Sequence, residues 1–73
     1  MSEKDEMKNS MVSQLATMLM EKDSDLSMEQ ALSLVINSDT YQKLMDDHTH
    51  LYFQSPSYVF SFLEHELTTG KIG

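Results

Sequence analysis

Apolar residues recur at helical intervals along the first third of the chain, and this spacing constrains the fold more than any other feature. Met7, Met11, Leu15 and Met18 follow one another at intervals of four, four and three. Such intervals place side chains on one face of an α-helix, which turns once in about 3.6 residues. Acidic residues crowd the start of the segment, where the helix dipole favours negative charge. The sequence therefore predicts a helix over residues 4–22.

A second helix is predicted by a capping pattern followed by apolar residues. Ser27 and Gln30 stand three residues apart, which is the spacing of a capping box at a helix N-terminus. The residues that follow are apolar on more than one helical face, and they are Ala31, Leu32, Leu34, Val35 and Ile36. Because a helix that is apolar on several faces is usually buried, we expect this segment to be the central helix of the fold.

The rest of the chain predicts one shorter helix and one longer one. Asp39 can cap a helix soon after the second one, although the polar break is so short that the two could form one kinked helix. Ser55 and Pro56 have the residue types of a cap and a first helical position, and the helix that they open is expected to end before Gly70.

The last helix is expected to supply the centre of the core, through the aromatic residues Tyr58 and Phe62 together with Leu63. No alternating strand pattern competes with the helical segments. The sequence therefore predicts an all-α fold, a compact bundle of three to four short helices. It forms a single domain over residues 1–73, with residues 1–5 and 71–73 expected to be frayed.

The short length of the chain predicts self-association as a source of stability. A domain of 73 residues has a small core, and the absence of cysteine removes disulfides and thiolate metal sites. Since the first helix carries more apolar residues than one neighbour can cover, we expect a homo-oligomer. The expected interface consists of Met11, Leu15, Met18 and Leu19, and a Leu15→Glu substitution would then disrupt assembly before it disrupts the fold.

The acidic charge disfavours several classes of partner. Twelve Asp and Glu residues oppose five dispersed lysines, giving a formal net charge of −7. Binding to nucleic acid or to an anionic membrane requires clustered cations, so neither partner is expected. The charged N-terminus lacks the apolar stretch of a signal peptide, and no apolar run approaches the ~20 residues needed to span a bilayer. A cytoplasmic location is therefore expected.

One segment has the composition of a metal site. Asp46, Asp47, His48 and His50 lie close together, and a His-x-His pair can chelate a transition metal with carboxylates completing the shell. A solvated loop between helices is the simpler interpretation, because no fixed zinc-ligand spacing is present. We therefore predict no metal ligand and no other cofactor-binding residue.

The sequence also lacks a recognisable catalytic arrangement. No serine lies in a Gly-x-Ser-x-Gly turn, and the only two glycines are near the C-terminus, so phosphate-binding loops are missing as well. No catalytic residue is predicted, and we expect a protein that is not an enzyme. The segment 31–44 has the layout of a helix-turn-helix, but its second helix carries aspartates that phosphate would repel.

A resemblance adds to these expectations. Residues 38–41, 51–59, 66–67 and 70–72, within the span 32–72, resemble a group of small uncharacterised bacterial proteins. Members of that group are similar in length and are often encoded beside toxin–antitoxin-like genes. The resemblance implies a helical bacterial accessory protein, and it transfers no functional residue.

Taken with the charge and the missing chemistry, these observations predict a protein–protein interaction or accessory module. Its partner is either a second copy or a different protein, and one form of the role is that of a neutralising member of a bacterial gene pair. The alternative is a small DNA-associated regulator of transcription.

Overall fold

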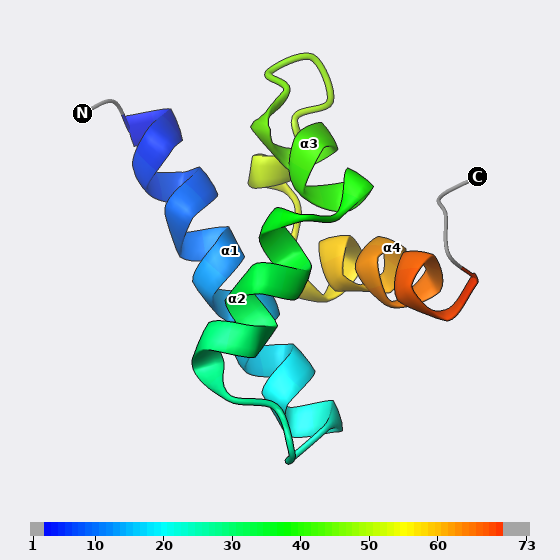
Figure 1. Ribbon diagram of the computed structural model, residues 1–73. Helices are drawn as coiled ribbons and strands as arrows, with labels where there is room; N and C mark the ends of the chain where they lie inside the picture. The colour runs from blue at the N-terminus through cyan, green and yellow to red at the C-terminus, as the bar shows by residue number, and fades with distance from the viewer. Residues whose placement is uncertain (1–2, 70–73) are drawn as a thin grey trace.

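Four α-helices and one 3₁₀-helix form the structure, a computed structural model that describes residues 3–69 (Figure 1). They are α1 (Glu3–Lys22), α2 (Met28–Ile36), α3 (Asp39–Met45), η1 (Leu51–Phe53) and α4 (Pro56–Thr69), and no strand occurs among these residues. The all-α prediction is confirmed. Of the ends that were predicted to be frayed, residues 3–5 form the first turn of α1, and the others lie outside the described range.

Helix α1 is the centre of the bundle. It contacts α2, α3, η1 and α4, and Figure 1 shows α2 returning across it after the turn that follows Lys22. Its buried side chains follow one face, and they are Lys8, Met11, Val12, Leu15, Ala16 and Leu19. Although α1 has 20 residues, neither it nor any other described helix combines the length and hydropathy that a membrane crossing requires.

Helix α2 begins as predicted but is not central. The Ser27 hydroxyl accepts a hydrogen bond from the backbone N–H of Gln30 at 3.1 Å, and the Gln30 side chain accepts one from the backbone N–H of Ser27 at 2.9 Å. Only Ala31 and Val35 are buried in α2, whereas Ile36 is 48% exposed. The prediction of a central second helix is wrong, because α2 packs on α1 with one side only.

Helices α2 and α3 are separate, and Ser38 rather than Asp39 caps the second of them. The Ser38 hydroxyl accepts from the backbone N–H of Tyr41 at 3.0 Å and donates to the carbonyl of Val35. Asp39 is the first residue inside α3. Ser38 thus satisfies groups of both helices at the junction, which fixes the direction in which α3 leaves α2.

Helix α4 begins at Pro56 as predicted, but a different face of it enters the core. Val59 and Leu63 are fully buried, and they lie four residues apart on the side that packs against α1 and α3. Tyr58 and Phe62 precede them by one residue each, which turns them about 100° away. Tyr58 is 49% exposed and Phe62 is partly buried, so the prediction of a central position is wrong for these two rings, whereas it is confirmed for Leu63.

Candidate protein-binding groove

The residues predicted for an interface lie mainly in the core of the single chain. Leu15 is fully buried, and Met11 and Leu19 are nearly so, while Met18 is partly buried against the same core. The prediction assumed that α1 has one neighbour, but it has four, and they cover its apolar residues. Met11, Leu15 and Leu19 are therefore not available to a second folded copy, and of the predicted interface only Met18 keeps exposed surface.

In the loop after α3, the side chains of Asp46, Asp47 and His50 contact other residues of the chain. Asp46 accepts a hydrogen bond from the backbone N–H of His48 at 2.9 Å and lies 3.1 Å from its ring, and these contacts lower the pKa of Asp46. Asp47 pairs with Lys8, and the ring of His50 makes edge contacts with the aromatic rings of η1. Within residues 3–69, no three His, Cys, Asp or Glu side chains are grouped to hold a metal ion.

Lys8 forms a polar contact that the sequence analysis did not predict. Its Nζ lies 2.6 Å from Asp47 Oδ1 and donates to the carbonyl of Met45 at 3.1 Å, and the Tyr52 ring centroid is 5.2 Å away. The hydrogen bond to Asp47 raises the pKa of Lys8 against the opposing effect of burial. Since Lys8 stands seven residues before Leu15 on the buried face of α1, its position in the stripe was the available signal.

Glu66 forms a second such contact, which ties α4 to the start of α3. Its carboxylate accepts hydrogen bonds from the backbone N–H of Asp39 at 2.7 Å, from that of Thr40 at 3.0 Å and from the Thr40 hydroxyl at 2.8 Å. Burial alone would raise the pKa of Glu66, but these three donors outweigh it and lower the pKa. A separation of 26 residues leaves no sequence signal for this pairing.

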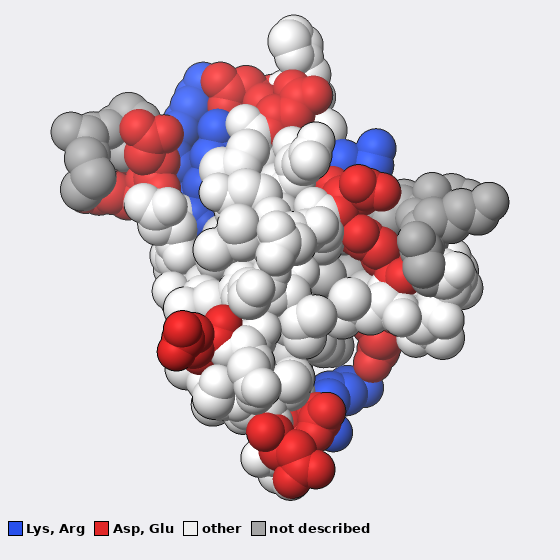
Figure 2. Space-filling view, viewed as in Figure 1, with Lys and Arg blue, Asp and Glu red and all other residues white. Residues whose placement is uncertain are grey.

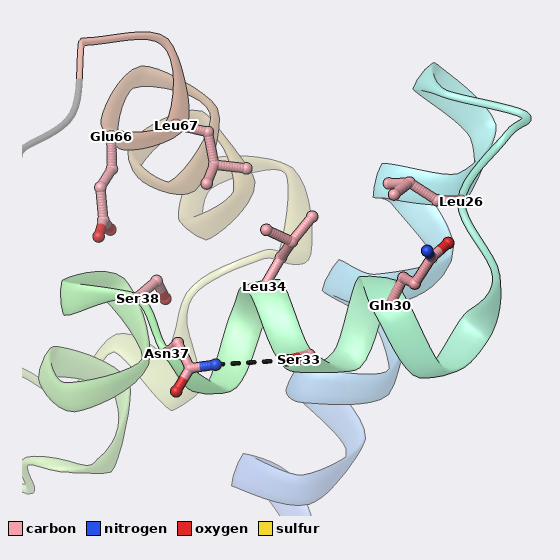
Figure 3. A pocket seen from close by; sticks show the side chains of 8 residues that line it. All are labelled: Leu26, Gln30, Ser33, Leu34, Asn37, Ser38, Glu66 and Leu67. Carbon is pink, nitrogen blue, oxygen red and sulfur yellow. Dashed lines mark hydrogen bonds between the residues drawn. The ribbon is translucent and has the colours of Figure 1, made fainter.

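A groove lies between helices α2 and α4. Both α2 and α4 pack on α1, and they diverge from each other (Figure 1). The α2–α4 groove is lined by Leu26, Gln30, Ser33, Leu34, Asn37, Ser38, Glu66 and Leu67. Figure 3 shows Leu34 and Leu67 pointing into it from opposite sides, and they remain 38% and 42% exposed. Leucines from two helices therefore form the apolar walls of an open groove.

The polar groups of the groove already have partners within the chain. Asn37 Nδ2 donates to Ser33 Oγ at 3.3 Å, as drawn in Figure 3, and the Gln30 side chain belongs to the capping box of α2. Ser38 and Glu66 both accept hydrogen bonds from backbone N–H groups at the N-terminus of α3. Among residues 3–69, the lining includes no histidine, lysine or cysteine, and its one carboxylate, that of Glu66, already accepts hydrogen bonds. The arrangement suits binding of an apolar surface.

No protein-family model, curated protein or solved structure matches this chain. The resemblance to small bacterial proteins near toxin–antitoxin-like genes therefore stays an expectation.

Proposed function

We propose that this protein is a non-enzymatic interaction module, and that its α2–α4 groove binds an apolar segment of a partner protein. One observation carries the proposal: Leu34 and Leu67 face a common groove from two helices and stay exposed, whereas the leucines of the core, such as Leu15, are fully buried. Apolar groups that are gathered at a concave site with a polar rim are typical of binding surfaces, whereas single scattered ones are not.

The walls of the groove are held in place before any partner arrives. The capping box fixes the start of α2, and Ser38 fixes its junction with α3. Glu66 then ties α4 to the same junction. A groove with walls fixed in this way loses little conformational freedom on binding, which favours affinity for a given contact area.

The charge supports a protein partner over the DNA alternative. Helix α3, the second helix of the helix-turn-helix-like segment, carries Asp39 and is followed by Asp46 and Asp47. A duplex would meet these carboxylates with its phosphates. We therefore keep the role of an accessory protein, in the bacterial cytoplasm and paired with a second gene product, as the finer form of this proposal.

Affinity capture with two matched variants tests the proposal. Leu34→Gln removes an apolar wall of the groove, and Ile36→Gln makes the same change two residues later on a side of α2 that does not line it. Both positions are exposed, so both variants should keep the helical circular dichroism of the parent. The parent and Ile36→Gln should retain the same bound protein, and Leu34→Gln should lose it. Equal recovery by all three proteins would refute the groove as the binding site.

A further inference from the structure

The charge around the groove indicates the chemistry of its occupant. Building on the proposed function, we propose that the α2–α4 groove binds a cationic amphipathic helix of another protein rather than a second copy of this chain. Three features carry this inference: carboxylates without cationic partners at the rim, the self-repulsion of the acidic chain, and the length of the groove wall.

The carboxylates that we call the rim are Glu66, in the lining, and the exposed residues Asp25 and Glu29, which each directly precede a lining residue in the sequence. Within residues 3–69, none of these three acids forms an ion pair with a lysine or histidine. Figure 2 shows carboxylates at several points around an uncharged central area that lies over α2. An apolar floor with an unbalanced acidic rim is complementary to a ligand with leucines and cations.

Among the described lysines, Lys8 and Lys22 pair with carboxylates other than these three. Lys22 pairs with Glu64 at 2.8 Å, and Lys8 is buried against Asp47. Glu66 remains ionised at neutral pH, because the hydrogen bonds from Asp39 and Thr40 lower its pKa. Its negative charge therefore persists at one end of the groove, where a lysine or arginine of a partner would meet it.

A second copy of this chain is a poor occupant. Each copy carries a net charge of −7, and a two-fold contact through the groove would bring each acidic rim close to its own equivalent. Like charges placed together across an interface disfavour association. On α1, Met11, Leu15 and Leu19 are buried within the chain and cannot form another symmetric contact. A partner of opposite charge meets neither difficulty.

The dimensions of the groove suit a helix. Its α2 wall has nine residues, which span about 13 Å at the rise of an α-helix. That length accommodates about two to three turns of a guest helix, whose apolar residues at positions i, i+3, i+4 and i+7 would meet Leu34 and Leu67. Cations on the flanks of the guest helix would then reach the carboxylates at the rim.

Two synthetic peptides test the proposal on the intact protein. Both have about 15 residues and leucines at the spacing just given, and the remaining positions are glutamine with lysine in one peptide and with glutamate in the other. We expect the lysine peptide to bind at least ~10-fold more tightly in a fluorescence anisotropy titration at low salt. Its advantage should shrink as the ionic strength rises from about 0.01 M to about 0.3 M.

Variants locate the binding. Leu34→Gln should weaken binding of the lysine peptide by roughly 10-fold or more, and Ile36→Gln should leave it unchanged. Glu29→Gln should weaken it less and should reduce its dependence on salt, because one rim charge is removed. Retention of full affinity by Leu34→Gln would place the cationic ligand outside the groove and overturn the inference.

The remaining outcomes separate this inference from the proposed function. Equal, Leu34-dependent binding of both peptides would overturn the charge argument and leave the groove as a docking site. Light scattering that shows a dimer, lost in Leu34→Gln, would likewise replace the cationic helix with a second copy. If neither peptide binds while affinity capture still depends on Leu34, the inference fails and the proposed function stands.

Discussion

Helices α1 and α2 pack against each other, yet they use their apolar residues in opposite ways. In α1, the leucines at positions 15 and 19 are buried, because four other elements surround this helix. In α2, Ala31 and Val35 are buried while Leu34 and Ile36 remain exposed. The number of apolar residues in a helix therefore does not decide its burial in this fold. Burial is decided by the number of sides on which the helix has neighbours.

This difference indicates that α1 mainly stabilises the fold and that the exposed side of α2 is used for binding. The buried face of α1 holds the bundle together, so changes there should cost folding free energy. The exposed side of α2 toward α4 contributes little to the core and should matter for a partner instead. The four predictions that follow test this division, from the largest expected change in stability to the smallest.

Leu15→Ala is expected to have the largest effect. Leu15 is fully buried at the centre of α1, and truncating a buried leucine costs about 2–5 kcal/mol through lost burial and the cavity left behind. Urea unfolding followed by circular dichroism gives the free energy, since the chain has no tryptophan for fluorescence. The same burial means that Leu15→Glu should unfold the chain, and not merely separate subunits. A Leu15→Ala protein as stable as the parent would refute the central position of α1.

Glu66→Gln is expected to cost about 1–2 kcal/mol, because the amide keeps one acceptor for the donors of Asp39 and Thr40 but loses the charge. Since the folded pKa of Glu66 is lowered, its contribution to stability is present above the unfolded value of about 4.3 and is lost as the pH falls through the folded value. The parent and the variant should therefore differ at pH 7 and converge on acidification. A difference that is constant with pH would contradict this.

Ser27→Ala is expected to cost about 1 kcal/mol, which is the usual effect of removing an N-cap hydroxyl. The substitution leaves the Gln30 backbone N–H without its acceptor and opens the capping box at the start of α2. Thermal unfolding of the parent and the variant measures the loss. Ser24→Ala, in the turn before the helix, is the matched control and should leave the melting temperature unchanged. If the two variants melt alike, the capping box does not hold α2.

The fold was largely predictable because its signals are local. The spacing of the methionines and leucines of α1, the Ser27 and Gln30 pair and the Ser55–Pro56 start each act within a few residues. The exposure of each face was not predictable in the same way, because it depends on which helices lie nearby. Thus Tyr58, Phe62 and Leu63 were predicted to be central, but of these only Leu63 is fully buried, and it packs with Val59, which was not predicted.

The candidate site was not predictable, because it is made by residues far apart in the sequence. Leu34 and Leu67 meet only because α2 and α4 pack on the same helix in different directions. The contacts that fix the groove walls are also long-range, as with Glu66 and Thr40. The sequence pattern placed the exposed apolar surface on α1, whereas the exposed large apolar residues of the described chain lie on α2, η1 and α4, and they are Met28, Leu34, Ile36, Phe53, Tyr58 and Leu67.

Leu34→Gln is expected to change stability least and binding most. Leu34 is 38% exposed, and a surface substitution of this kind usually alters the free energy of unfolding by no more than about 0.5 kcal/mol. Glutamine is a good helix former, so α2 should persist. The variant should therefore melt within a few degrees of the parent and still bind the lysine peptide roughly 10-fold or more weakly. A large loss of stability would show that Leu34 belongs to the core like Leu15, and the contrast between α1 and α2 would then disappear.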